Sequence, residues 1–177
     1  MINVQEYARA LFMLTEELGT TDTVLVDSEI VDAVLAENPS LVKLLDTPAL
    51  TGAEKHAVID AAFSTLDVSL CNLIRILADK RGVYLLARVL RAYRALCDEA
   101  RGIERVEAIT ALPLTDAQLA RLKEKLEART GKVIIITNTQ DPSIIGGIKL
   151  RYMGVQLDGS LKTRLDGFER ALKETII

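Results

Sequence analysis

The stretch that decides the fold lies near the end of the chain, where residues 144–168 read IIGGIKLRYMGVQLDGSLKTRLDGF. Isoleucine and leucine favour a strand here, and Gly146-Gly147 interrupts the pattern with two residues that lack a Cβ atom. Such an interruption predicts a bulge or the close approach of another element. A second short strand is expected over residues 155–158, and Ser160 follows Asp158-Gly159 in a position to cap a helix. We therefore expect a glycine-kinked hairpin that leads into an amphipathic helix. The apolar stripe of that helix would consist of Leu161, Leu165, Phe168 and Leu172.

The beginning of the chain carries helical periodicity instead. Asn3 is placed to cap a first helix with Glu6 as its capping-box partner, and Gly19 ends that helix. Its apolar residues recur in steps of three and four, which predicts an inward-facing seam. The seam consists of Val4, Tyr7, Leu11, Leu14 and Leu18. Further apolar residues on both sides of it leave two interpretations open: they pack into the core, or they form a docking face for a partner.

Five more helices are expected before Gly102. Pro39, a break at residues 46–48 and a capping box over residues 51–54 separate the second, third and fourth helices. The fifth ends in a basic turn followed by Gly82, which we expect to be its C-terminal glycine. The outer positions of the second helix are expected to be acidic: Asp22, Asp27, Glu29, Asp32 and Glu37. The inward stripe of the sixth is expected to be Leu86, Val89, Leu90, Tyr93, Cys97 and Ala100, with Arg88, Arg91 and Arg94 on its solvated sides.

After Gly102 the spacing of the apolar residues changes from that of a helix to the alternation of a strand. Alternating residues predict strands over 105–110 and 132–139, and a capping box at Thr115 opens a helix between them that Gly131 ends. Helices followed by a mixed segment indicate an α+β fold with two domains: an N-terminal six-helix bundle (residues 1–102) and a small mixed α/β domain (residues 103–177). The first carries 10 basic against 15 acidic residues and the second 12 against 10, which suits two domains that face different partners.

Several classes of protein are excluded by residues that the chain lacks. No apolar run approaches the roughly 20 residues that span a bilayer, and the first residues do not form a signal-peptide pattern, so we expect no direct membrane insertion. Cys71 and Cys97 fall within apolar helical patterns and are expected to be reduced core thiols. With His56 as the only histidine, zinc binding and histidine-assisted catalysis are not expected. We expect no enzyme, no cofactor and no metal.

Three stretches resemble one family. The end of the chain is similar to the C-terminal signature of the ATP synthase delta subunit, the family of the mitochondrial oligomycin-sensitivity-conferring protein. The residues that carry this similarity are Gly146, Gly147, the segment from Val155 through Asp158, Gly159 and Ser160, and then Arg164. Residues 7–12, YARALF, resemble the opening helix of that family. Residues 72–75, NLIR, followed by Gly82, resemble its fifth-helix region.

The resemblance implies a non-catalytic stator subunit of the F-type ATP synthase, located peripherally at the cytoplasmic face of the cell membrane. In the family, the first and fifth helices form a groove for the N-terminal segments of alpha subunits. The positions of this chain that match are Tyr7, Ala10, Leu11, Asn72 and Ile76. The resemblance also implies that residues 103–177 hold the b subunits of the peripheral stalk. Because aromatic residues are few and the helical half is net acidic, we expect no nucleic acid as a partner. Two alternatives stay open from the sequence: a generic two-domain protein–protein adaptor, and a nucleic-acid binder that uses the basic edge of the sixth helix, formed by Arg88, Arg91, Arg94 and Arg101.

Overall fold

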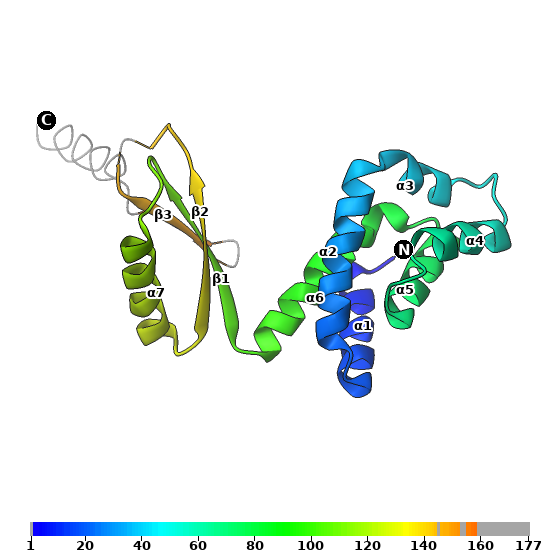
Figure 1. The fold of residues 1–177 in the computed structure, drawn as a ribbon, viewed down its shortest axis with the longest axis horizontal. Helices are drawn as coiled ribbons and strands as arrows, with labels where there is room; N and C mark the ends of the chain where they lie inside the picture. The colour runs from blue at the N-terminus through cyan, green and yellow to red at the C-terminus, as the bar shows by residue number, and fades with distance from the viewer. Residues whose placement is uncertain (1, 145, 153–154, 159–177) are drawn as a thin grey trace, which may run out of the picture. The chain divides into compact units, whose positions relative to one another are not determined.

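The computed structural model describes residues 2–144, 146–152 and 155–158 (Figure 1). The chain divides into two compact units at the junction of Ala100 and Arg101. Helices occupy the first unit, and a sheet with one helix occupies the described part of the second, so the fold is α+β, as the sequence predicts. None of the helices in the described ranges has the length and hydropathy that crossing a lipid bilayer requires.

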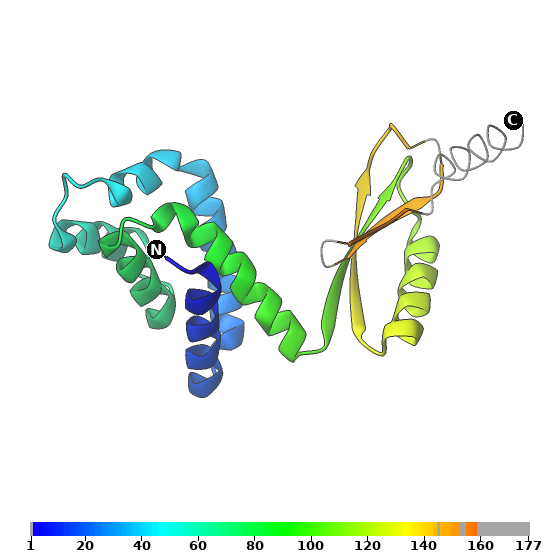
Figure 2. The ribbon, with the colours of Figure 1, turned by 180° about the vertical axis from the view of Figure 1, so that it is seen from behind.

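The first unit is built around one hydrophobic core. Its elements are α1 (Val4–Leu18), α2 (Thr21–Glu37), α3 (Pro39–Asp46), α4 (Gly52–Ala62), α5 (Val68–Asp79), the 3-10 helix η1 (Val83–Leu85) and α6 (Leu86–Ala100). Tyr93 and Phe63 are the largest side chains buried in this core, to which every helix of the unit contributes (Figures 1 and 2). The predicted capping box of α4 is present, with Thr51 and Glu54 exchanging hydrogen bonds, and these bonds lower the pKa of Glu54.

The second unit contains β1 (Ile103–Thr110), α7 (Asp116–Thr130), β2 (Val133–Gln140), β3 (Ile148–Tyr152) and β4 (Val155–Asp158). The sheet has the order β2-β1-β3-β4. β1 and β2 run parallel with α7 as their crossover, whereas β3 is antiparallel to both β1 and β4. Inward-facing residues of α7, namely Leu119, Leu122 and Leu126, are half-buried. The predicted capping box at Thr115 is also present.

The inward face of α1 differs from the predicted seam. Ala8, Leu11 and Thr15 are the buried residues of this helix, whereas Leu14 and Leu18 are 43% and 57% exposed. Thr15 is accommodated because its hydroxyl lies 3.1 Å from that of Tyr93, a residue 78 positions away in the sequence. The buried face of α1 is therefore rotated, and two leucines of the predicted seam lie outside the core. The predicted capping box is also not formed, because Glu6 accepts a hydrogen bond from the side chain of Asn3 and not from its backbone.

The acidic residues of α2 are not all on its outer face. Asp27 is buried and accepts a hydrogen bond of 2.7 Å from the backbone N–H of Asp67, the residue that caps α5. Asp32 pairs with Arg94 of α6, so this arginine is half-buried and not on a solvated side. Ala100, expected in the inward stripe of α6, is exposed.

Two predicted glycine positions also differ. Arg81, with φ of 52°, takes the left-handed conformation after α5, and Gly82 has φ of −125°. A Cβ atom at Gly82 would lie 2.0 Å from Cδ1 of Ile2, so the end of that side chain would have to move. Gly146 and Gly147 lie before β3 and not inside a strand, so no kinked strand forms at them. Gly147 has φ of 89°, a conformation that favours glycine.

The burial of Asp27 gives a stability prediction. Replacing Asp27 with alanine is expected to lower the free energy of unfolding of the helical unit by about 2 kcal/mol, because a long-range helix cap is lost and the N–H of Asp67 is left without its acceptor. The measurement is urea unfolding followed by far-ultraviolet circular dichroism. The matched control is Glu29→Ala on the exposed side of the same helix, which should change the value by less than about 0.5 kcal/mol. Equal effects of the two variants would contradict the capping role.

Candidate functional site

The helices α1 and α5 lie side by side with opposite chain directions (Figures 1 and 2). The end of α5 meets the beginning of α1, where the Lys80 ammonium lies 5.6 Å from the centre of the Tyr7 ring. Hydrogen bonding with Tyr7 raises the pKa of Lys80, so this contact favours the charged lysine. The pair marks sides of α1 and α5 that lie close together.

Residues at helical spacing from this contact share its face. On α1, Ala10, Leu14 and Leu18 follow Tyr7 in steps of three and four; on α5, Ile76 and Asn72 precede Lys80 in steps of four. We define the α1/α5 face by the residues of these two rows together with Leu11: Tyr7, Ala10, Leu11, Leu14, Leu18, Asn72, Ile76 and Lys80. Leu14 and Leu18 were not predicted to belong to this surface, because the sequence pattern placed both in the inward-facing seam of the first helix.

Three large apolar side chains of the α1/α5 face are exposed. Ile76 is 46% exposed, and with Leu14 and Leu18 it gives three large apolar side chains open to solvent. Leu11, by contrast, is 4% exposed and belongs to the core, so it supports this surface from below. Ala10 is exposed and small, and it leaves room for another chain to approach α1. The surface can bind an apolar partner.

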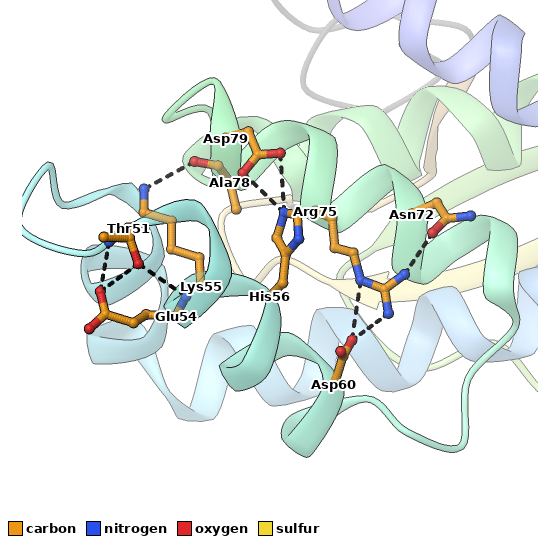
Figure 3. Close-up of polar contacts among 9 residues, drawn as sticks. All are labelled: Thr51, Glu54, Lys55, His56, Asp60, Asn72, Arg75, Ala78 and Asp79. Carbon is orange, nitrogen blue, oxygen red and sulfur yellow. Dashed lines mark hydrogen bonds and ion pairs between the residues drawn. The ribbon is translucent and has the colours of Figure 1, made fainter.

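A row of polar contacts joins α4 to the side of α5 that lies next to the α1/α5 face (Figure 3). His56 Nε2 lies 3.0 Å from Asp79 Oδ1, and Lys55, which is buried, donates a hydrogen bond to the carbonyl of Ala78 at 3.1 Å. Arg75 joins Asp60 of α4 to Asn72 of α5. These contacts fix the position of α5, and therefore that of the two site residues it carries.

No catalytic constellation is present in the described part of the chain. Cys71 and Cys97 are both buried and free. Burial raises the pKa of the Cys71 thiol, whose Sγ donates to the carbonyl of Phe63, so it is poorly suited to act as a nucleophile. Within the described ranges, no group of three histidine, cysteine or carboxylate residues is placed to hold a metal ion.

The signature residues of the second unit are only partly described. Gly146 and Gly147 lead into β3, and Asp158 ends β4, where its backbone pairs with that of Lys149. Gly159, Ser160 and Arg164 lie outside the described residues, as does the expected final helix.

Comparison with known proteins agrees with this picture of a binding protein. The family model described as "ATP synthase delta (OSCP) subunit" matches residues 4–172. The chain is 35% identical over 170 residues to "ATP synthase subunit delta" of Azorhizobium caulinodans, an alignment that covers 95% of this chain and 91% of the relative. It is 32% identical over 180 residues to the protein of the same description from Clostridioides difficile, with 99% of both chains covered.

A solved structure shows the same fold. A chain in the cryo-electron microscopy structure of the Toxoplasma gondii mitochondrial ATP synthase hexamer matches with a TM-score of 0.73 and 22% identity, over 97% of this chain and 98% of that one. The family model and the sequence relatives match nearly the whole length of the chain. The chain therefore belongs to the ATP synthase delta (OSCP) subunit family, and it is a non-catalytic stator subunit that links the catalytic head of the F-type ATP synthase to the peripheral stalk.

Proposed function

We propose that the α1/α5 face binds the N-terminal segments of alpha subunits in the catalytic head. The observation that carries this proposal is the exposure of Leu14, Leu18 and Ile76 in two rows above the buried Leu11. An amphipathic helix laid along this face would cover all three side chains with its own apolar side. In this mode of binding, Ala10 permits close approach of the two backbones, and Tyr7 and Asn72 border the apolar area.

The expected affinity of this surface is moderate. Each of the three exposed side chains has about half of its area left to bury, so each contributes about 1 kcal/mol. Together the three side chains supply about 3 kcal/mol, which is less than the roughly 8 kcal/mol of a micromolar complex, so the other contacts of the bound segment must supply the rest. A second contact elsewhere on the same chain raises the overall affinity through effective concentration.

We also propose that the second unit, residues 103–177, holds the b subunits of the peripheral stalk. Val133 and Ile135 on β2 are 53% and 38% exposed, and β2 is an edge strand of the described sheet. Exposed apolar side chains on an edge strand suit a protein partner. In this assignment the N-terminal six-helix bundle binds the head and the mixed α/β domain binds the stalk. The subunit then works at the cytoplasmic face of the cell membrane, held there by protein contacts and without insertion.

Nucleic-acid binding has less support than the sequence suggested. Arg88 and Arg91 of α6 are exposed, but Arg94 is committed to Asp32 and Ser28, and Arg101 also has an interaction partner. A basic edge of two arginines supplies little counterion release.

The proposal is tested by mapping where an alpha-subunit peptide binds. A synthetic peptide of about 20 residues from the alpha N-terminus is titrated into the isotope-labelled full chain, and backbone amide shifts are recorded by nuclear magnetic resonance. We expect the largest shifts on α1 and α5, around Ala10 and Ile76. The exposed apolar residues Val26 and Ile30 of α2 form a competing surface within the same unit. Shifts centred on α2 would reject the assignment to α1 and α5.

A further inference from the structure

A short polar relay runs from α4 across α5 and ends on the α1/α5 face (Figure 3). Arg75 donates hydrogen bonds to Asp60 through Nε, at 3.2 Å, and through Nη2. Its third donor, Nη1, bonds to Oδ1 of Asn72 at 2.6 Å. All three side chains lie near the surface, and Asp60 and Asn72 are exposed.

This relay fixes the orientation of the Asn72 amide. A guanidinium group only donates hydrogen bonds, so the amide atom that faces it must be the oxygen. The Nδ2 group then points away from Arg75, as Figure 3 shows, and no described residue accepts a hydrogen bond from it. Asn72 therefore offers a donor to the surroundings of the α1/α5 face.

We infer that Asp60 and Arg75 are positioning residues that hold Asn72 as a hydrogen-bond donor for a partner's oxygen. This inference rests on the proposed function and specifies it further: the bound alpha segment must place a carboxylate, a carboxamide or a free main-chain carbonyl next to Asn72. The charged guanidinium polarises the amide and strengthens its N–H donors. Because the side chain is already held in place, less rotamer freedom is lost on binding.

Two substitutions at Asn72 isolate the donor. Asn72→Asp preserves the size of the side chain and its contact with Arg75 but offers only acceptors; Asn72→Leu removes the donor without adding a charge. We expect each to weaken binding of the synthetic alpha-subunit peptide about tenfold in calorimetry, the loss typical of one hydrogen bond. The thermal melt should not change, because the residue is exposed.

The positioning residues are tested separately. Asp60→Ala leaves Arg75 less confined and should weaken peptide binding about threefold, whereas Glu29→Ala, which removes an exposed carboxylate from α2, should have no effect. The side-chain Nδ2 resonance of Asn72 is the second readout. In the wild-type protein it should shift downfield when the peptide binds, and in Asp60→Ala this shift should be smaller.

The outcomes separate this inference from the proposed function. Unchanged peptide affinity in both Asn72 variants, with normal binding by the wild type, would overturn the donor role. Weakening by Asn72→Asp alone would indicate charge repulsion and would overturn it as well. Absence of any binding by the wild-type chain would reject the proposed function itself, and the inference with it.

Discussion

Replacing Ala10 with arginine is expected to weaken binding of the alpha N-terminal segment by about 100-fold or more, which corresponds to about 3 kcal/mol. Ala10 is exposed in the middle of the α1/α5 face, next in helical spacing to Tyr7 and Leu14. A long charged side chain there occupies the space of the incoming helix and would be buried without a partner. Calorimetry with the synthetic alpha-subunit peptide measures the effect.

Stability should hardly change in this variant, which makes the binding result interpretable. Arginine and alanine have similar helix propensities, and the position is exposed. We expect the free energy of unfolding to stay within about 0.5 kcal/mol of the wild type. Ala33→Arg on the exposed side of α2 is the matched control, because it adds the same side chain to a helix outside the α1/α5 face. Equal peptide binding by Ala10→Arg and Ala33→Arg would contradict the assignment of the site.

Truncation after residue 102 is expected to abolish capture of the b subunits while leaving head binding at full strength. The cut falls between α6, which ends at Ala100, and β1, which begins at Ile103. The last buried residue of the helical core is Cys97, so the fragment keeps its whole core and should fold alone. The measurements are peptide affinity and co-purification with a soluble b-subunit fragment.

The full chain serves as the control for the truncated protein, and its helical unfolding transition should match that of the fragment. If the fragment retained the b subunits, residues 103–177 would not be the stalk-binding part. The assignment of the first unit to the head and the second unit to the stalk would then be wrong. If it lost the alpha peptide while remaining folded, the helical unit would need the second unit to bind.

Most of the features that local sequence determines were predicted, with the capping box at Asn3 and the C-terminal glycine at Gly82 as exceptions. The capping boxes at Thr51 and Thr115 each involve residues three positions apart, and both are present. The alternation that begins near Arg105 marks β1, although the strand starts two residues earlier, at Ile103. Such signals need no knowledge of the tertiary structure.

The features that depend on distant residues were not predictable. Thr15 is buried because it meets Tyr93, and Asp27 is buried because it bonds to Asp67, the N-cap residue of α5, which lies 40 positions later. With Thr15 inside, the buried face of α1 rotates and Leu14 becomes exposed. The helical spacing of the apolar residues marks both possible faces of α1, and only tertiary packing decides which one the core takes.

The candidate site stays a prediction. Helical spacing from the contact between Lys80 and Tyr7 places Ala10, Asn72 and Ile76 on adjoining sides of α1 and α5, whereas Leu11 belongs to the core. The relay from Asp60 through Arg75 could not be read from the sequence, because its residues are 15 positions apart on two helices. Their geometry appears only when α4 is packed against α5.

This subunit is non-catalytic, and its role is mechanical: it resists rotation of the head. A rotor that turns inside the head exerts an equal and opposite torque on it, so the head must be held by a link with two binding surfaces. Without that link, hydrolysis of ATP would continue while the head turned together with the rotor, and no protons would be moved. Coupling is therefore the property that the link controls.

The most direct measurement is proton pumping driven by ATP in membrane vesicles depleted of this subunit, with ATP hydrolysis recorded in parallel. We expect depleted vesicles to hydrolyse ATP without pumping, the wild-type chain to restore pumping, and Ala10→Arg to fail at the same concentration. Full pumping in the absence of the subunit would contradict the claim.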